Sequence, residues 1–592
     1  MTGQTLSGIP VSAGISIGQA YLLGEDHYCL IPMQNISEDL VAQEAERLKQ
    51  AFEKALEELK QIRTAIPVEQ SEHVAILDVH IMILNDPKLL STTQRYIHDM
   101  HLNAEWALEK GVTEIEKRFE AIDDDYFRER AQELRLLTRR VKNQLIGSPE
   151  TIKPITSRVI LLANNLTPAD TAELDVSKIM AFATVQGART SHVAILARTL
   201  EIPAVAGVEG LLTAVQDGDI IIIDGLKGYV VVNPDDDELT KYSDLKYQFE
   251  HYRKEVMRHR DLPAVTTDGH KIDLFANIEL FEEVSAVFDY AGDGVGLYRT
   301  EYSYLNRSDL PSEEELFEEY RDLASILAPR TLIIRTLDAG GDKIGQGFEH
   351  LDEENPVLGL RAVRFCLRYK DIFKTQLRAI LRASQLENVS LMFPMISGTS
   401  ELRAIKKILE ETKAELREQS IPFGEQMAVG IMMELPSAVM IADILAKEVD
   451  FFAIGTNDLI QYSLGIDRTN KYVAHLYQPL HPALIRSLKF IVDAGHENGI
   501  EVSMCGEMAS DPYCLPVLVG MQVDSLSLNP QSIPAIKKIL RNLSLRECSE
   551  LLERILESDS VSRNNQLIRD NIFKKFPDEL MFYSSMLERE EE

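Results

Sequence analysis

The sequence predicts a multidomain α/β protein: an α/β domain interrupted by an inserted helical bundle, followed by a C-terminal TIM (β/α)8 barrel. Three features indicate this architecture. The chain of 592 residues is too long for one ordinary domain, and its hydrophobic content of 45% is enough for more than one core. Apolar residues recur at helical spacing between 37 and 146 but form strand-like runs between 150 and 233. From about residue 265 onward, eight short apolar strands alternate with helical stretches, as in a TIM barrel.

The α/β domain is expected to combine residues 1–24 and 148–233. The first segment mixes Gly and Ser with short apolar runs, which is typical of one or two strands with tight turns. Because it is too short to fold alone, its strands should pair with strands of the second segment. That second segment contains four strand-like runs around two helices, at 159–162, 179–183, 220–223 and 229–232.

A helical bundle is expected over residues 25–147, between the two halves of that domain. Within 37–63, apolar residues recur at alternating three- and four-residue steps, which places them on one face of a helix. Further helices are predicted near 70–84, 103–120 and 126–146. Residues 234–262 are heavily charged, and we predict that they form a solvated helix connecting two domains.

Residues 263–592 are assigned to the barrel. Its eight predicted strands cover 272–278, 294–298, 331–335, 390–395, 429–434, 451–454, 501–504 and 524–528. In TIM barrels the active site lies at the carboxyl ends of the strands. The residues at those ends are therefore the candidates for chemistry.

Cationic side chains gather at these strand ends and in the loops nearby. They are Arg299, Arg335, Lys343, Arg361 and Arg468. A single arginine at such a place is as often a surface ion pair, but several on one barrel face are hard to explain by packing. Guanidinium groups bind phosphate and carboxylate oxygens in a bidentate way, so the set suits a small, highly anionic phosphorylated acid.

Three further strand-end residues carry different chemistry. Glu434 and Asp458 supply hard oxygen ligands for Mg²⁺, which usually takes one or two carboxylates plus substrate oxygens. Cys505 follows the seventh strand in an otherwise polar setting, where a thiol can act as a proton donor or as a nucleophile.

A separate candidate is His192, in the segment GARTSHVAILAR. Apolar residues recur at helical spacing from Val193 onward, so a helix is predicted to begin near Ser191 with His192 in its first turn. The free amides and positive dipole end there favour an anion and disfavour a protonated imidazole. A neutral histidine at such a place is a reasonable phosphoryl acceptor, although a lone histidine there is more often a polar surface residue.

The composition narrows the possible partners and location. The formal charge of −32 argues against nucleic acid and against an acidic membrane surface, and it suits a basic protein partner. The five cysteines show no CxxC pairing, which argues against a disulfide framework and fits a reducing cytoplasm. The first residues do not resemble a signal peptide, and no apolar run is long enough to insert in a membrane. We therefore expect a cytoplasmic protein.

Over nearly its whole length the sequence resembles the phosphoenolpyruvate–protein phosphotransferase family, Enzyme I of the bacterial phosphotransferase system. The resemblance is carried by GARTSHVAILAR, GDGVGLYRTEYSYL, IIRTLDAGGDK, ENPVLGLRAVR, FFAIGTNDLIQYSLGIDR, HLYQP and MCGEMA. Several long motifs in this order make the match specific. One departure is Ala188, which replaces a Gly common in the GGRTSH form; an alanine in an ordinary turn or helical conformation costs little.

The resemblance implies that the α/β domain is a phosphohistidine domain. His192 would accept the phosphoryl group of phosphoenolpyruvate as tele-phosphohistidine and pass it to a histidine of the phosphocarrier HPr, the first step of phosphotransferase-system sugar uptake. Because one histidine would serve both the barrel and the carrier, we expect this domain to swivel as a unit. The resemblance also implies that the helical insertion docks HPr, with His80 and Arg130 on the docking surface, and that the barrel mediates homodimerisation.

For the barrel site, the resemblance implies that Arg299 and Arg335 hold the phosphate and that Cys505 protonates the enolate to give pyruvate. Glu434 and Asp458 would bind Mg²⁺. The remaining substrate contacts would come from Asn457, Asp458, Arg468, Arg361 and Lys343.

Three alternatives compete with this interpretation. A phosphoenolpyruvate synthase or pyruvate phosphate dikinase needs a nucleotide-binding domain, for which the sequence offers no Gly-rich phosphate loop. A nitrogen-related paralogue is expected to carry a sensory domain ahead of the phosphohistidine domain, so the general form is favoured. A non-catalytic docking scaffold predicts decay of the site, yet its candidate residues are all present.

Overall fold

The computed structural model describes most of the chain. The described residues are 3–23, 35–65, 81–120, 134, 137–138, 140–142, 144–145, 155, 157–166, 176–187, 196–197, 200–304, 309–340, 353, 355–467, 470 and 472–576. The chain forms two compact units, Met1–Phe249 and Glu250–Glu592, each with its own hydrophobic core. Among the described residues, no helix is long and apolar enough to cross a membrane.

Three helices of the N-terminal unit pack around one apolar core. They are α1 (Val41–Ala65), α3 (Pro87–Met100) and α4 (Ala104–Glu120). In α1 the buried residues Leu48, Ala55 and Leu59 lie on one face, as the apolar spacing predicted. The helices predicted near 37–63 and 103–120 are therefore confirmed, whereas those near 70–84 and 126–146 lie largely outside the described residues.

Helix α3 was absent from the prediction, although its sequence carries the usual signals. Asp86 accepts a hydrogen bond from the backbone N–H of Lys88 at 2.8 Å and so caps the helix. Pro87 occupies the first turn, where it costs no backbone hydrogen bond. Leu89, Thr93 and Ile97 follow at four-residue steps and are all buried.

The described strands of the N-terminal unit form an eight-stranded sheet, in the order β1-β8-β7-β3-β4-β5-β6-β2. Its strands are β1 (Gln4–Ser7), β2 (Ile9–Ser12), β3 (Ile15–Leu23), β4 (Val159–Ala163), β5 (Ile179–Thr184), β6 (Ala204–Ala206), β7 (Ile220–Asp224) and β8 (Tyr229–Val232), with the short helix α8 (Leu211–Ala214) before β7.

The pairing of this sheet confirms that the first residues pair with strands found much later in the chain. Strand β1 pairs with β8 and β2 with β6, both antiparallel. Strand β3 lies between β7, which is antiparallel to it, and β4, which is parallel. Residues 1–24 hold three strands, β1, β2 and β3, where one or two were predicted. The prediction also missed β6, whose three residues are too few to stand out as an apolar run.

Helix α9 (Asp236–Met257) confirms the predicted charged helix, and the boundary between the two units falls within it. Its first turn contains three acidic residues, Asp236, Asp237 and Glu238, whose negative charges interact favourably with the positive end of the helix dipole. The finer division of the N-terminal unit, at residues 24/25 and 147/148, stays a prediction.

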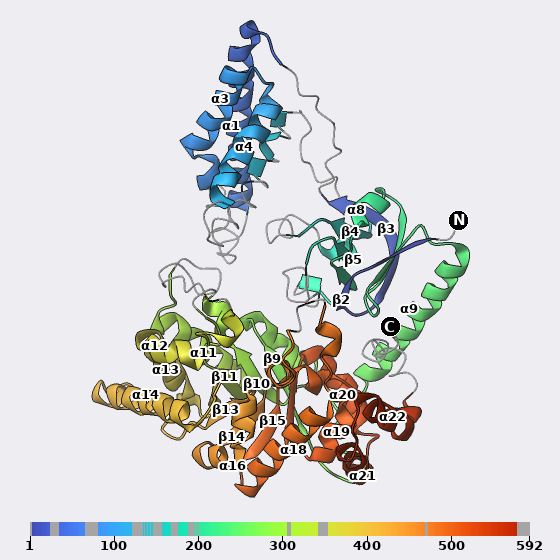
Figure 1. Ribbon diagram of the computed structural model, residues 1–592, viewed down its shortest axis with the longest axis vertical. Coiled ribbons are helices and arrows are strands. Elements are labelled where there is room, and N and C mark those ends of the chain that lie inside the picture. The colour runs from blue at the N-terminus through green and yellow to red at the C-terminus, as the bar shows by residue number, and fades with distance from the viewer. Residues whose placement is uncertain are drawn as a thin grey trace. The chain divides into compact units, whose positions relative to one another are not determined.

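The C-terminal unit is a closed barrel of eight parallel strands surrounded by helices (Figure 1). The strands are β9 (Asp273–Ile278), β10 (Gly294–Arg299), β11 (Thr331–Arg335), β12 (Val389–Phe393), β13 (Val429–Met433), β14 (Phe451–Ile454), β15 (Glu501–Met504) and β16 (Ser525–Leu528). All eight predicted strands are confirmed. The largest difference is the end of β12, since Met395 adopts a positive φ of 57° that no strand residue takes.

The surrounding helices follow the strands in order. They are α10 (Val284–Asp289), α11 (Glu313–Leu327), α12 (Val363–Arg368), α13 (Lys370–Ala383), α14 (Thr399–Glu418), α15 (Pro436–Val439), α16 (Ala442–Leu445), α17 (Thr456–Leu464), α18 (Pro482–Glu497), α19 (Leu515–Met521), α20 (Ile533–Leu540), α21 (Leu545–Leu556) and α22 (Val561–Asn571). A separate cluster, which includes Leu297, Met392 and Met432, takes residues from successive strands and fills the barrel interior. The candidate site lies above this layer, at the carboxyl ends of the strands.

Candidate active site at the carboxyl ends of the barrel strands

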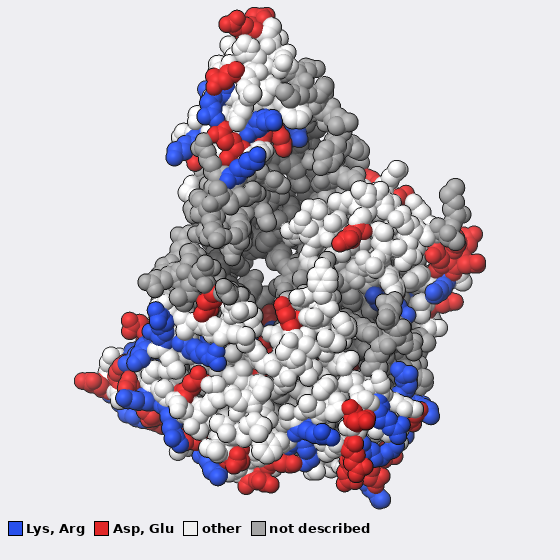
Figure 2. Space-filling model, in the orientation of Figure 1, with Lys and Arg blue, Asp and Glu red and all other residues white. Residues whose placement is uncertain are grey.

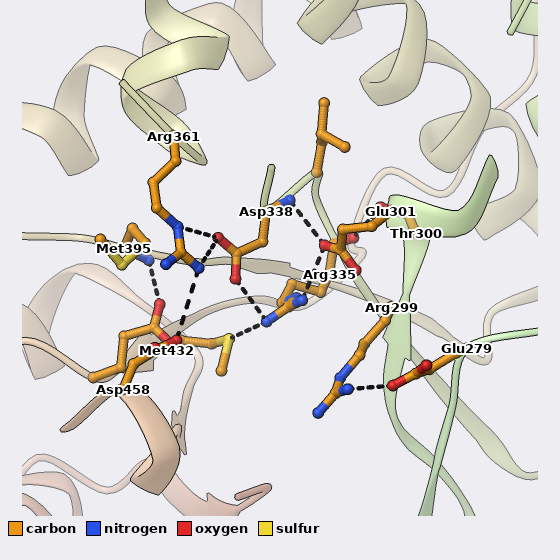
Figure 3. Close-up of polar contacts among 12 residues, drawn as sticks. Glu279, Arg299, Thr300, Glu301, Arg335, Asp338, Arg361, Met395, Met432 and Asp458 are labelled. Atoms are coloured by element: carbon orange, nitrogen blue, oxygen red, sulfur yellow. Dashed lines mark hydrogen bonds and ion pairs between the residues drawn. The ribbon is translucent and has the colours of Figure 1, made fainter. Parts of the chain in front are cut away.

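Arg335, the last residue of β11, is a buried arginine held by two carboxylates. Its Nη2 donates to Glu301 Oε1 at 2.9 Å, and its Nη1 lies 3.0 Å from Asp338 Oδ2 (Figure 3). Burial alone would lower the pKa of Arg335, but these carboxylates outweigh it and raise the pKa above its ordinary value. The guanidinium therefore stays charged within the protein interior.

Arg361 shares one of these carboxylates. Its Nε and Nη2 donate to Asp338 Oδ1 at 3.2 and 2.8 Å, and Nη2 lies 3.9 Å from Asp458 Oδ2. Asp338 thus lies between two guanidinium groups, as Figure 3 shows, and fixes their separation. The residue after Arg361, Ala362, has φ 54° and ψ −130°, a backbone conformation that costs a non-glycine residue energy.

Arg299, the last residue of β10, is the most accessible of these arginines. It forms an ion pair with Glu279, and both side chains are partly exposed (Figure 3). Its Nε is buried and has no hydrogen-bond partner, as is also true of the Nε of Arg335. A buried donor without a partner is costly, so these two atoms indicate places where a ligand oxygen would be stabilised.

Glu434, directly after β13, is fully buried, and only one of its two carboxylate oxygens has a hydrogen-bond partner. Its Oε1 accepts a hydrogen bond from the Met395 backbone N–H at 2.5 Å, whereas its Oε2 has no partner. A Cβ at Gly455 would lie only 2.8 Å from that Oε2, so glycine keeps the space beside it open. Burial raises the pKa of Glu434 to about 8, with Asp458 and Asp338 adding to the shift and Arg335 opposing it.

The two carboxylates Glu434 and Asp458 fit a magnesium ion that completes its coordination with substrate oxygens and water. The unpartnered Oε2 leaves one oxygen of Glu434 open to a ligand. No group of three or more His, Cys, Asp or Glu side chains in the described part of the chain could hold a metal ion alone.

Cys505, directly after β15, is 2% exposed, and its thiol donates to the Ile454 carbonyl oxygen across 3.5 Å. Burial raises the pKa of the Cys505 thiol to about 12; Glu434 adds to this, while Arg335 and Arg299 oppose it. The thiol is therefore protonated at neutral pH, as a proton donor must be and a nucleophile must not.

Asn457, in the first turn of α17, connects two neighbouring strand ends. Its Oδ1 accepts a hydrogen bond from the Glu507 backbone N–H at 2.9 Å, and its Nδ2 lies 3.4 Å from Glu507 Oε1. Glu507 begins the segment after β15, so Asn457 ties that segment to the end of β14.

Three family models of phosphoenolpyruvate-utilising enzymes match the chain. The PEP-binding domain matches residues 253–545, the N-terminal domain residues 7–130 and the mobile domain residues 155–228. A phosphoenolpyruvate-protein phosphotransferase of Staphylococcus aureus is 39% identical over 570 residues, covering 96% of this chain and 99% of the relative. The chain belongs to the phosphoenolpyruvate-protein phosphotransferase family.

Two further phosphoenolpyruvate-protein phosphotransferases give the same result. That of Priestia megaterium is 39% identical over 95% of this chain and 98% of its own length. That of Geobacillus stearothermophilus is 40% identical over 93% of this chain and 96% of its own length. An Enzyme I protein solved by NMR is 34% identical and covers 41% of this chain and 99% of its own, with a TM-score of 0.34, too low to inform the fold.

The structure brings many of the residues predicted from sequence to one end of the barrel. Those it describes are Arg299, Arg335, Arg361, Glu434, Asn457, Asp458 and Cys505. The other candidates, His192, Lys343, Arg468, His80 and Arg130, lie outside the described residues.

Two carboxylates of the site, Glu301 and Asp338, received no role from the sequence. Glu301 comes two residues after Arg299, and Asp338 three residues after Arg335, so both follow strand ends as the arginines do. Their position shortly after a strand end was the sequence signal that could have identified them. It did not reveal that Glu301 pairs with the arginine of the next strand, because this contact depends on how β10 and β11 are paired.

Proposed function

We propose that this chain transfers the phosphoryl group of phosphoenolpyruvate to its own His192 and from there to a histidine of the phosphocarrier HPr, releasing pyruvate. This is the first step of sugar uptake by the phosphotransferase system. The observation that carries the proposal is the arrangement at the barrel mouth, in a chain of this family: arginines held charged by Asp338, beside the unpartnered carboxylate oxygen of Glu434.

In this proposal Arg299 and Arg335 bind the phosphate of phosphoenolpyruvate. Phosphoryl transfer needs alignment and neutralisation of the oxygens of the transferred group more than covalent help from the protein. The two Nε atoms without partners support such a role. The Arg299–Glu279 pair is partly exposed, and ion pairs of that kind are weak, so phosphate can replace Glu279 at little cost.

Further substrate contacts are assigned to Arg361, Arg468, Lys343 and Asn457. Glu434 and Asp458 would hold Mg²⁺, which supplies positive charge to the oxygens of the bound substrate. Since Mg²⁺ binds a deprotonated carboxylate, the metal would displace the proton that burial favours on Glu434.

Cys505 is assigned the role of proton donor. When the phosphorus–oxygen bond of phosphoenolpyruvate breaks, the phosphoryl group passes to His192 and the electron pair stays on the enolate oxygen. The enolate carbon then takes the thiol proton of Cys505 to give pyruvate, and the thiolate recovers a proton from water. The pKa of about 12 keeps that proton available at neutral pH.

His192 is assigned as the tele-phosphohistidine, and the helical part of the N-terminal unit as the HPr dock, with His80 and Arg130 on the docking surface. We further propose that the protein is cytoplasmic and forms a homodimer through the barrel.

Incubation with phosphoenolpyruvate labelled on phosphorus, with and without HPr, tests this function. We expect Mg²⁺-dependent, acid-labile label on the protein, transfer of the label to HPr, and one pyruvate released for each phosphoryl group transferred. Peptide mass spectrometry under neutral conditions should locate the group on His192. Absence of label, or label on another residue, would overturn the proposal.

A further inference from the structure

A buried glutamine of α13, Gln376, lies behind the two arginines assigned to the phosphate. Its side chain is 1% exposed, and both of its polar atoms are hydrogen-bonded. It belongs to none of the motifs that carry the family resemblance, and it is 76 residues from its partner Thr300. A buried amide is costly unless its partners are complete, so this arrangement requires an explanation.

The hydrogen bonds of Gln376 connect the ends of two neighbouring strands. Its Nε2 donates to Thr300 Oγ1 at 2.9 Å, and that hydroxyl in turn donates to the carbonyl oxygen of Arg335 at 2.9 Å. On its other side, Gln376 Oε1 accepts a hydrogen bond from the Leu337 backbone N–H at 3.0 Å. Nε2 also donates to Tyr320 Oη at 3.3 Å, which anchors the amide to α11.

These contacts fall immediately beside the phosphate arginines. Thr300 follows Arg299 directly, and the Thr300 hydroxyl binds the backbone of Arg335 itself. Gln376 and Thr300 therefore join the backbone carrying one guanidinium to the backbone carrying the other. We call Gln376, Thr300 and their hydrogen bonds to Arg335 and Leu337 the bracket.

The strand ladder is irregular just before these two ends and stops at them. The pairing of β10 with β11 shifts register between Val295 and Tyr298, and both strands stop at the paired residues Arg299 and Arg335. Such an irregularity removes ladder hydrogen bonds just before the ends. The bracket supplies fixed hydrogen bonds beyond the point where the ladder stops.

We propose that Gln376 is a positioning residue: through Thr300 it sets the register of Arg299 and Arg335 so that both reach one phosphate. This rests on the proposed function. Gln376 itself touches no substrate. Because bidentate contacts lose strength steeply with misplacement, a shift of about 1 Å between the two arginines is enough to weaken binding strongly.

The test measures binding of phosphoenolpyruvate with Mg²⁺ by calorimetry, in a full-length His192→Ala parent that cannot consume the ligand. The variants are Gln376→Met and Thr300→Val, which remove hydrogen bonds at nearly constant volume, and the double variant. Thr300→Ser keeps the hydroxyl. Asn388→Leu is the matched control, because Asn388 is also a side-chain amide that joins two backbone segments. Its Nδ2 donates to the carbonyl oxygens of Ala324 and Arg330 at 3.0 and 2.9 Å, at the opposite ends of the strands.

We expect Gln376→Met and Thr300→Val each to weaken binding roughly tenfold, and the double variant to be no weaker than the weaker single variant, because the bracket acts as one unit. Thr300→Ser should bind like the parent. Asn388→Leu should lower the melting temperature without changing the dissociation constant. Thr300→Val also keeps the test decisive if Gln376→Met does not fold.

Parent-like binding by Thr300→Val would overturn the inference, as would losses that multiply in the double variant. Equal weakening by Asn388→Leu would show general loosening of the barrel and would also overturn it. Failure of the parent to bind phosphoenolpyruvate is a different outcome, because it would overturn the proposed function and therefore this inference as well.

Discussion

At the scale of single residues, the candidate site is an arrangement of charges whose protonation is set by burial and by the neighbouring charges. Arg335 and Arg361 stay charged because Asp338 lies between them. Glu434 has no such partner on Oε2, and burial raises its pKa to about 8. Cys505 is buried as well and keeps its proton. One carboxylate oxygen is thus buried without a hydrogen-bond partner, and one buried thiol keeps its proton.

The raised pKa of Glu434 predicts a pH dependence of stability when divalent cations are removed. The folded state holds this proton more tightly than the unfolded chain, whose glutamate pKa is near 4.5. The resulting stabilisation is complete below pH 4.5 and is lost as pH rises through about 8, by at most about 1.4 kcal/mol per pH unit for one proton. In EDTA, the urea midpoint of the wild type should therefore fall from pH 5.5 to 7.5 relative to Glu434→Gln.

Addition of Mg²⁺ should remove most of this difference in the wild type and have little effect on Glu434→Gln, because the metal binds the deprotonated carboxylate. Parallel urea midpoints for the two proteins across this pH range would contradict the assignment.

Cys505→Ala should slow pyruvate formation roughly 100-fold, the usual contribution of a general acid, while the fold survives. The control is Cys548→Ala in α21, another buried cysteine whose pKa burial raises to about 12. Stopped-flow measurement of pyruvate release should separate the two variants. An unchanged rate in Cys505→Ala would remove the thiol from the mechanism.

At the scale of elements, the barrel helices hold the strand ends through contacts on their inner faces and through their termini. Helix α11 carries Tyr320, a partner of Gln376, and pairs with α13 through Glu313, which contacts Arg378 and Arg382 at 2.5 and 2.8 Å. The bracket therefore depends on the placement of both α11 and α13.

Helix α11 begins with a reciprocal capping box. Ser312 Oγ accepts a hydrogen bond from the Glu315 backbone N–H at 3.3 Å, and Glu315 Oε2 accepts one from the Ser312 N–H at 2.7 Å. Ser312→Ala should destabilise the protein by about 1 kcal/mol, measured as a lower urea midpoint. Ser325→Ala, in the same helix but exposed and away from the cap, should change stability by less than about 0.5 kcal/mol. Equal effects of the two substitutions would argue against a capping contribution.

At the scale of the whole molecule, the chain divides its proposed chemistry between two units. His192 belongs to the N-terminal unit, and the proposed phosphoenolpyruvate site belongs to the barrel. On the face drawn in Figure 2, acidic and basic side chains are interspersed over the barrel unit, in keeping with ion pairs such as Lys374–Glu415 and Arg417–Glu425. The large negative charge of the chain is thus partly compensated locally.

Because the two sites lie in different units, His192→Ala should abolish phosphoryl transfer to HPr and still bind phosphoenolpyruvate. We expect the dissociation constant for pyruvate with Mg²⁺, which neither protein can consume without a phosphoryl donor, to agree within about twofold between the wild type and His192→Ala, since residues without shared contacts act independently. Calorimetry and the labelling assay measure the two properties separately. Loss of binding in His192→Ala would show that the barrel site is incomplete without the histidine.

The sequence by itself determined the eight barrel strands, the charged helix α9 and most of the site residues that the structure describes. Each barrel strand is a short apolar run, and the candidate side chains lie at its end or shortly after it, so position along the chain was enough to find them. The family motifs then assigned roles that no periodicity contains. By contrast, α3 was missed even though its cap and spacing are local.

Only the tertiary structure decided which of these side chains meet. Glu301 pairs with Arg335, and Gln376 with Thr300, because closure of the barrel brings strand ends together across 34 and 76 residues of sequence. The pKa of Glu434 likewise depends on burial by segments distant in sequence. Contacts and burial of this kind arise from the packed fold, so the spacing of residues along the chain does not encode them locally.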